Sequence, residues 1–229
     1  WSVKRTLSEN DHNEDMELLD FGYSQSKWVS EQVVRRAMEC GLQTRIFRPA
    51  LISPSLKGEG AEADIAIRLL AFILKHGLAT NARNQVSFTP VDQVARNIVA
   101  TSNSETGLGQ TFHVTRDEYA SLSQITVILS QLSHRTLEYL ELGDFVDSVI
   151  DRCTAEDPLF PLLNFFVRSM ENINAMEFKR YDNSNYRSAR AQAPQGQGDP
   201  PLEDVTAGIA EFMRQKGLMG DLAHHLGGK

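Results

Sequence analysis

A tyrosine and a lysine four residues apart, Tyr23 and Lys27, are the side chains of this sequence best placed to do chemistry together. They stand at the start of a segment with helical periodicity, and residues i and i+4 of a helix lie one above the other on the same face. A nearby ammonium favours the ionised phenol, so this pair could exchange a proton closer to neutral pH than free tyrosine does. The spacing alone is also common by chance, so the surrounding sequence has to decide its meaning.

The composition is that of an ordinary globular protein and argues against several classes of function. The chain has 229 residues, of which 41% are hydrophobic and 23% charged, and its net charge is −7. This charge argues against nucleic acid or an anionic membrane as the main partner, and no apolar run has the length of a membrane span. Cys40 and Cys153 are too few for a disulfide framework and lack metal-ligand spacing. We therefore expect no metal site and a reducing, cytoplasmic setting.

Helical and extended patterns alternate along the first part of the chain. A predicted helix over 24–39 is followed by a predicted strand over 44–49, which ends at Pro49. A helix followed closely by a strand is half of a βαβ unit, the repeat of parallel-sheet α/β folds. Further predicted helices cover 64–76, 92–100, 122–132, 145–153, 158–170 and 205–216, and further predicted strands cover 84–91, 110–115 and 137–140.

Several other features have ordinary structural explanations. We predict that the apolar residues of 159–166 are core rather than the wall of a substrate pocket. The basic and aromatic residues of 179–190, among them Tyr181 and Tyr186, predict a solvated face that could also contact an acidic carrier domain. Residues 194–201 predict a flexible linker, and the six residues from 224 to 229 a disordered tail. The histidines, including His113, have no partners at metal-ligand spacing.

Three segments, in this order along the chain, resemble landmarks of the extended short-chain dehydrogenase/reductases. They are Gly22-Tyr23-Ser24-Gln25-Ser26-Lys27-Trp28-Val29-Ser30-Glu31, Arg45-Ile46-Phe47-Arg48-Pro49-Ala50-Leu51-Ile52 and Asn84-Gln85-Val86-Ser87-Phe88-Thr89-Pro90-Val91-Asp92-Gln93-Val94-Ala95. Two of the chain's motifs resemble one subgroup in particular, the thioester reductase domains. They are the Ser-Lys-Trp-Val-x-Glu motif at 26–31 and the Asp-Pro-Leu-Phe-Pro motif at 157–161. Such domains end nonribosomal peptide synthetases, polyketide hybrids, carboxylic acid reductases and aminoadipate reductases. The similarity runs from about residue 21 to residue 190.

The resemblance implies an α/β fold, made of the C-terminal part of a Rossmann-type domain and a mostly helical substrate-binding lobe. We assign residues 1–110 to the NADP-binding part, with interleaved lobe segments, and residues 111–229 mainly to the lobe. The family's glycine-rich turn does not stand before Tyr23, and its catalytic Ser or Thr would precede Trp1, with Ser2 a weaker stand-in. We therefore expect this chain to be a C-terminal fragment that binds NADPH poorly, or not at all, without its N-terminal remainder.

The family's roles transfer to four residues that match its motifs. Tyr23 matches the catalytic proton donor, and Lys27 matches the lysine that lowers the pKa of the tyrosine and hydrogen-bonds the nicotinamide ribose. Pro49 and Ile52 fall where the family lines the nicotinamide pocket. The implied reaction is NADPH-dependent reduction of a thioester on a phosphopantetheinylated carrier domain to an aldehyde, or onward to the alcohol. We expect a monomeric module.

Two other functions remain open at this point. A redox-inactive relative could release its product by Dieckmann-type cyclisation, which needs no hydride. Alternatively, the helical lobe could be a non-catalytic docking fragment that recognises the carrier domain. The identity of the acyl or peptidyl substrate is left open by the sequence.

Overall fold

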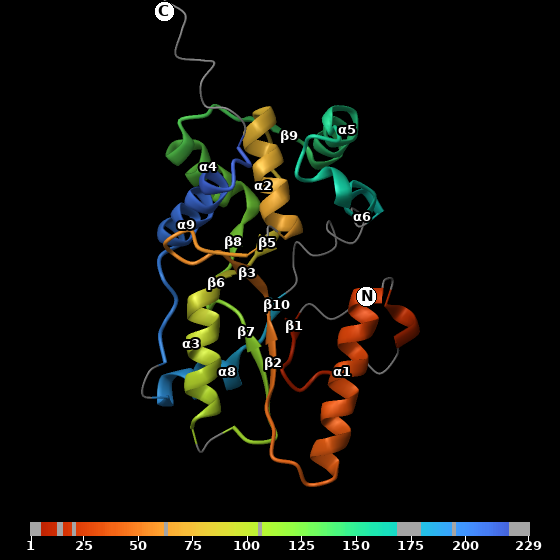
Figure 1. Cartoon of the computed structure of the whole chain (residues 1–229), viewed down its shortest axis with the longest axis vertical. Coiled ribbons are helices and arrows are strands. Elements are labelled where there is room, and N and C mark those ends of the chain that lie inside the picture. The colour runs from red at the N-terminus through yellow and green to blue at the C-terminus, as the bar shows by residue number, and fades with distance from the viewer. Residues whose placement is uncertain are drawn as a thin grey trace, which may run out of the picture. The chain divides into compact units, whose positions relative to one another are not determined.

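A computed structural model describes residues 6–12, 16–19, 22–61, 64–104, 107–168, 180–193 and 196–219. The chain divides into two compact units, each made of three stretches of sequence. The first unit contains 1–50, 92–117 and 178–199, and the second contains 51–91, 118–177 and 200–229. The predictions for Ser2 and for the tail lie outside the described residues. Figure 1 shows the elements of both units along the chain.

The first unit is built on parallel strand pairs with helices beside them. Strand β2 (Ile46–Pro49) pairs with β7 (Thr111–Val114), and β1 (Thr6–Leu7) pairs with β10 (Arg180–Tyr181), both in parallel. Its other elements are η1 (Met16–Leu18), α1 (Gly22–Glu39), α3 (Val91–Ser102, whose first residue belongs to the second unit) and α8 (Ser184–Gln192). A small core joins β7, α3 and α8 through Val94, Phe112, Val114, Tyr186 and Ala189.

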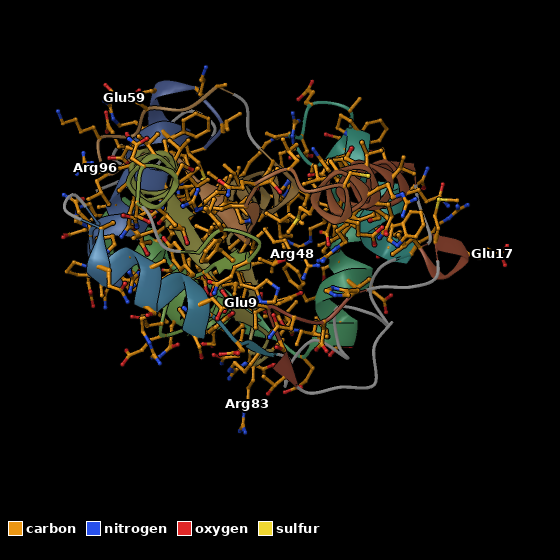
Figure 2. The ribbon with its side chains drawn as sticks, turned by 90° about the horizontal axis from the view of Figure 1, so that it is seen from below. Glu9, Glu17, Arg48, Glu59, Arg83 and Arg96 are labelled. Carbon is orange, nitrogen blue, oxygen red and sulfur yellow. The ribbon has the colours of Figure 1, made fainter. Side chains whose placement is uncertain are left out.

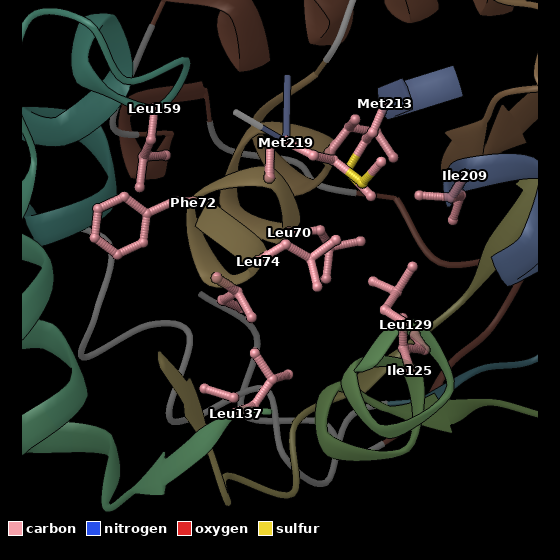
Figure 3. Packing of buried hydrophobic residues seen from close by; sticks show 14 of the residues in the cluster. Leu70, Phe72, Leu74, Ile125, Leu129, Leu137, Leu159, Ile209, Met213 and Met219 are labelled. Atoms are coloured by element: carbon pink, nitrogen blue, oxygen red, sulfur yellow. The ribbon is translucent and has the colours of Figure 1, made fainter. Parts of the chain in front are cut away.

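The second unit combines three strand pairs with a larger set of helices. Strands β3 (Leu51–Ser53) and β6 (Phe88–Pro90) are parallel, β4 (Leu78–Thr80) and β9 (Glu138–Leu140) are parallel, and β5 (Gln85–Val86) and β8 (Ala120–Ser121) are antiparallel. Among the described residues, the helices of this unit are α2 (Ile65–His76), α4 (Leu122–Ser133), α5 (Leu142–Arg152), η2 (Phe160–Leu162), α6 (Leu163–Arg168) and α9 (Leu202–Gln215). Helices α2, α4 and α9 pack on one another and enclose the main apolar core (Figure 3).

Helix α2 is the central element of this core, and local residues define both of its ends. Asp64 caps the N-terminus by accepting a hydrogen bond of 3.0 Å from the backbone N–H of Ile67. Gly77 ends the helix in the left-handed conformation at φ 67°. Six residues between Ile67 and Leu74 are buried, so the helix is covered on more than one side.

Most predicted elements are found within a few residues of their predicted bounds, but four predictions need correction. The segment 158–170 is, over its described part, the short η2 followed by α6 rather than one helix, since Pro161 lies within η2. Its apolar residues are only partly core: Leu159 and Phe166 are buried, whereas Phe160 and Phe165 are exposed. The segment alternates between the two environments because a short helix turns only one side to the core.

The polar stretch before residue 190 is not a simple solvated face. Tyr186 is fully buried, because α8 packs against β7 and the Tyr186 hydroxyl accepts a hydrogen bond of 2.9 Å from the Asn97 amide. The described part of the predicted linker, 196–201, is also held in place. The Gln197 N–H donates to Asn97 Oδ1 at 2.9 Å, and the Gln197 carbonyl accepts from the Asn97 amide at 3.2 Å.

The predicted functional boundary between residues 110 and 111 stays a prediction, since compact packing units are not functional domains. The packing units cross that boundary in both directions. In the part of the chain that the structure describes, no helix has the length and apolar character needed to cross a bilayer.

A close approach of backbone to backbone in the second unit gives a stability prediction. A Cβ added at Gly208 of α9 would lie 2.4 Å from the Ser55 carbonyl oxygen and 3.0 Å from Leu56 Cα. We expect Gly208→Ala to lower the free energy of unfolding by about 1 to 3 kcal/mol, because backbone rather than a flexible side chain has to move. Urea unfolding measures the change.

The matched control for this substitution is Gly143→Ala in helix α5. A Cβ at Gly143 meets nothing within 4 Å. Alanine in an open helical position is expected to stabilise by up to about 1 kcal/mol. Equal effects of the two substitutions would contradict the contact between α9 and the loop that contains Ser55.

Candidate functional site

Helix α1 presents the predicted Tyr23–Lys27 pair to solvent. Both side chains are exposed, Tyr23 to 67%, and the Lys27 ammonium nitrogen lies 5.5 Å from the centroid of the Tyr23 ring. The Ser26 hydroxyl donates to the Tyr23 carbonyl at 2.7 Å within the first turn of the helix. The phenol and the ammonium therefore lie on one helical face, as the spacing predicts, and are accessible to an external molecule.

Pro49 and Ile52 lie close together in the sequence, in two successive strands. Pro49 is the exposed last residue of β2 in the first compact unit. Ile52 is in β3 of the second unit, with 39% of its surface exposed. The exposure of both residues makes each available for contact, and their role as nicotinamide contacts stays a prediction.

A forked ion pair ties helix α1 to strand β2. Arg48 Nε donates to Glu31 Oε2 at 2.9 Å, and Arg48 Nη2 donates to Glu31 Oε1 at 2.5 Å. Arg35, one turn further along α1, donates to the same Oε1 at 2.8 and 2.9 Å. Burial acts to raise the pKa of Glu31, but the hydrogen bonds from Arg48 and Arg35 outweigh it and hold the pKa below its usual value. Glu31 is therefore a carboxylate shared by two guanidinium groups.

The same guanidinium of Arg48 reaches the neighbouring strand and the N-terminal segment. Its Nη1 lies 3.0 Å from the Asp11 carbonyl oxygen and 3.3 Å from His113 Nε2. The other ring nitrogen of His113, Nδ1, lies 2.8 Å from the Asp182 carbonyl oxygen. A carbonyl only accepts and a guanidinium only donates, so His113 fits as the neutral tautomer with its proton on Nδ1. Burial lowers the pKa of His113, which agrees with this neutral form.

A buried carboxylate, Glu9, organises the other side of strand β7. Only 1% of Glu9 is exposed, and its oxygens accept hydrogen bonds from the backbone N–H groups of His113, Asn185 and Tyr186 at 2.8, 2.6 and 3.1 Å. Two of these donors lie in the first turn of α8, where N–H groups have no partner within the helix. Burial raises the pKa of Glu9, although the three backbone donors act to lower it. In Figure 2, Glu9 and Arg48 lie among the other side chains, whereas Glu17 points outward.

We expect Glu9→Gln to destabilise the protein by about 1 to 3 kcal/mol. In the wild type, Glu9 Oε1 accepts from His113 and Tyr186, and Oε2 accepts from Asn185. The amide nitrogen of glutamine is a donor, so it would leave at least one of these buried N–H groups unsatisfied. Chemical unfolding measures the loss, and Glu17→Gln, at an exposed position, is the control. A change below about 0.5 kcal/mol, the size typical of surface substitutions, would contradict the assigned role.

The buried side chain of Arg190 forms ion pairs with two residues at which the chain leaves the first unit. Arg190 Nη2 donates to Asp117 at 2.8 Å and its Nη1 donates to Asp199 at 3.0 Å. Asp117 and Asp199 are the last residues of two of the stretches that form this unit. The guanidinium also lies over the ring of Tyr186, at 5.2 Å. Charge neutralisation by two carboxylates explains how an arginine is tolerated in this buried position.

The Asp-Pro-Leu-Phe-Pro stretch contains the strongest polar anchor of the second unit. The buried Asp157 accepts from Lys75 and His76, each at 2.9 Å, at the C-terminal end of α2. Its other oxygen accepts from the Thr154 N–H at 2.8 Å and from the Thr154 hydroxyl at 3.0 Å. Arg68 of α2 donates to the Pro158 carbonyl at 2.7 Å. These bonds fix the loop to α2, which makes Asp157 a structural residue.

The motifs of the sequence assign no role to Glu31, Arg48, Glu9, Arg190 or Asp157. For Glu31 a signal was present, because Tyr23, Lys27, Glu31 and Arg35 are each four residues apart on one helix. For Glu9 and Arg190 the partners lie far away in the sequence, and no local pattern indicates them. Within the described ranges, no group of three or more His, Cys, Asp or Glu side chains is arranged to hold a metal ion.

Comparison with known proteins finds sequence similarity to reductases and to peptide synthetases. A family model described as "Male sterility protein", of an NAD-binding family, matches residues 3–98. The nonribosomal peptide synthetase asaC of Aspergillus flavus is 27% identical over 205 residues, which are 85% of this chain and 20% of that protein. The L-2-aminoadipate reductase of Schizosaccharomyces pombe is 31% identical over 174 residues, or 74% of this chain and 12% of that protein.

Solved structures confirm the predicted α/β fold class. The terminal R domain from the myxalamid PKS-NRPS biosynthetic pathway superposes with a TM-score of 0.84 at 22% identity. That match covers 96% of this chain and 56% of the solved chain. A thiolation-reductase di-domain from an archaeal non-ribosomal peptide synthetase gives a TM-score of 0.73 at 18% identity and covers 93% of this chain and 44% of that one. The chain thus spans about half of these structures and a fifth or less of the two curated relatives.

Proposed function

We propose that this chain, a homologue of the reductase domains of nonribosomal peptide synthetases and of L-2-aminoadipate reductases, takes part in reductive release of a carrier-bound thioester. The observation that carries the proposal is the exposed Tyr23–Lys27 pair on α1, within the segment that the NAD-binding family model matches. The whole reaction is proposed for a longer protein, because this chain spans only part of its relatives.

The residues present fit one part of a nicotinamide cofactor. Tyr23 and Lys27 offer a phenol and an ammonium on the same exposed face, which suits hydrogen bonding to ribose hydroxyls. Pro49, the last residue of β2, and Ile52, within β3, offer exposed apolar surface, which suits a nicotinamide ring. We propose NADPH as the cofactor. A glycine-rich turn of the kind that binds a pyrophosphate does not stand before Tyr23.

In this mechanism the chain supplies proton delivery and orientation. Bound NADPH supplies the hydride that reduces the thioester carbon. Tyr23 gives its phenolic proton to the oxygen of the same carbonyl group, and the positive charge of Lys27 favours the tyrosinate that remains. Collapse of the resulting hemithioacetal releases the aldehyde and the carrier thiol. A second reduction of the aldehyde in the same way would give the alcohol.

The partner in this proposal is a phosphopantetheinylated acyl or peptidyl carrier domain in the cytoplasm, and the module acts as a monomer. Support for this partner comes from the matches to synthetases, and from a solved relative in which a thiolation domain and a reductase domain are joined. The chain's net charge of −7 does not by itself attract an acidic carrier, so local contacts have to provide the recognition.

The test is an assay with an N-terminally extended protein that supplies a nucleotide-binding half. It is mixed with NADPH and a carrier domain loaded with an acyl thioester. Loss of NADPH absorbance together with an aldehyde or alcohol in the mass spectrum is expected. Release of a cyclised product without NADPH consumption would support the Dieckmann-type alternative, and carrier binding without any turnover would support the docking alternative. For the 229-residue chain alone, titration calorimetry is expected to show weak NADPH binding or none.

A further inference from the structure

The face of α1 that carries Tyr23 and Lys27 continues into the contact with the sheet. Four residues of α1 follow one another at four-residue intervals and therefore lie along nearly the same face of the helix: Tyr23, Lys27, Glu31 and Arg35. We call this row of side chains the α1 stripe. Tyr23 and Lys27 are exposed, whereas the side chains of Glu31 and Arg35 are each only 20% exposed. The first two residues of the α1 stripe are therefore exposed to solvent, whereas the last two contact the strands of the sheet.

Apolar packing alone holds α1 only weakly. None of the eighteen residues of α1, all of which the structure describes, is buried, and Val29 and Val33 are among its exposed side chains. The helix therefore lacks a fully buried apolar face that would fix its rotation about its own axis. Polar contacts to the sheet have to supply this constraint.

Glu31 and its two arginines provide those contacts. The Arg48 fork joins Glu31 to β2, and Arg35 Nη2 extends to the Thr111 hydroxyl of β7 at 3.3 Å. A two-bonded guanidinium–carboxylate pair fixes direction as well as distance. Glu31 lies one helical turn after Lys27 on the same helix. Fixing where the Glu31 side chain points therefore also fixes which way the Lys27 and Tyr23 side chains point.

We infer that Glu31 and Arg48 are positioning residues, which lock the rotation of α1 so that Tyr23 and Lys27 face the reacting carbonyl. This inference rests on the proposed function. It goes further by assigning a task to two residues that touch neither substrate nor cofactor in the mechanism above. A rotation of α1 that moves the phenol by about 1 Å would be enough to lower the rate by about a hundredfold.

The test compares Glu31→Gln, Arg48→Gln and the double variant in the extended protein. Each single variant is expected to lower kcat by about 10- to 100-fold. The KM values for NADPH and for the thioester are expected to change much less, because neither residue binds them. The double variant is expected to be no slower than the slower single variant, since both substitutions break the same fork. Arg48→Lys, which keeps the charge and loses the fork, is expected to fall between Arg48→Gln and the wild type.

The matched control is the second ion pair on the same helix. Arg36 and Glu39 are joined at 2.6 Å, but their side chains are 79% and 63% exposed. Arg36→Gln and Glu39→Gln are expected to leave kcat unchanged. All variants are compared by circular dichroism and thermal unfolding, and assays are run at a temperature where each is folded.

A second measurement in the 229-residue chain does not depend on turnover. The amide NMR signals of residues 22–27 are expected to shift in a similar way in Glu31→Gln and in Arg48→Gln, and to stay unchanged in Arg36→Gln. Unchanged signals in the first two variants would overturn the inference. So would kcat values equal to those of the controls, or losses that multiply in the double variant. A Tyr23→Phe variant that keeps full turnover would instead overturn the proposed function, so the two failures are distinguishable.

Discussion

Tyr23→Phe in the extended protein is expected to lower turnover of the carrier-bound thioester by about a hundredfold to ten-thousandfold, the range usual for loss of a general acid. The substitution removes only the phenolic oxygen. Phenylalanine keeps the ring, and with it the contact to the Lys27 ammonium, which lies 5.5 Å from the ring centroid in the wild type. Tyr23 is 67% exposed, so little packing is lost and the protein is expected to stay folded.

The measurement is the initial rate of NADPH oxidation, with aldehyde formation followed by mass spectrometry. Tyr139→Phe is the control, because the Tyr139 hydroxyl contacts only Thr126 at 3.3 Å among the hydrogen bonds described and the residue is also partly exposed. Lys27→Met, which keeps the length of the side chain and removes its charge, is expected to lower the rate. Equal rates for Tyr23→Phe and Tyr139→Phe would rule out Tyr23 as the proton donor.

Asp157→Asn is expected to lower the free energy of unfolding by about 2 to 3 kcal/mol, because it removes a buried carboxylate to which several donors, among them a lysine ammonium, are bonded. The carboxylate of the wild type accepts from Lys75, His76 and Thr154. The amide of asparagine presents N–H groups where a carboxylate oxygen accepts these bonds. Urea unfolding near neutral pH measures the loss, and Asp151→Asn, on an exposed part of α5, is the control.

The contribution of Asp157 to the free energy of unfolding is also expected to depend on pH. Burial acts to raise the pKa of Asp157, but hydrogen bonds from Thr154, Lys75 and His76 outweigh it and hold the pKa well below its usual range. The unfolded chain has a pKa of about 3.9 at this residue, so the stabilisation is complete above about pH 4 and is lost as the pH falls further. The difference in stability between wild type and Asp157→Asn is therefore expected to shrink in acid. A difference that stays constant down to about pH 2 would contradict this ion pair.

Helices whose ends are defined by capping residues close to them in the sequence could be predicted from the sequence. Helix α2 begins at its Asp64 cap and ends at Gly77, and helix α4 begins at a capping box formed by Ser121 and Gln124. The Tyr23–Lys27 face is also local, because a four-residue spacing on a helix fixes which side chains share a face. The resemblance to reductases rests on such short ordered motifs, and the comparisons confirm it.

The polar anchors of the fold could not be predicted in this way, because their partners are distant in the sequence. Glu9 binds residues more than one hundred positions away, and Arg190 joins α8 to Asp117. Tyr186 stands among polar residues and its sequence context indicates exposure, but packing of α8 on β7 buries it. A short amphipathic helix gives too little periodicity to show which of its sides faces a core.

The sequence by itself determined that a phenol and an ammonium share one helical face, and which family of reductases the surrounding motifs resemble. Only the tertiary structure decided how that face is held. Glu31, Arg48 and Arg35 meet because the strand β2 returns beside α1, and their contact fixes the helix through bonds that no spacing along the chain encodes. The physical reason is that helix periodicity is a property of neighbouring residues, whereas the rotation of a helix on a sheet depends on the residues that folding brings against it.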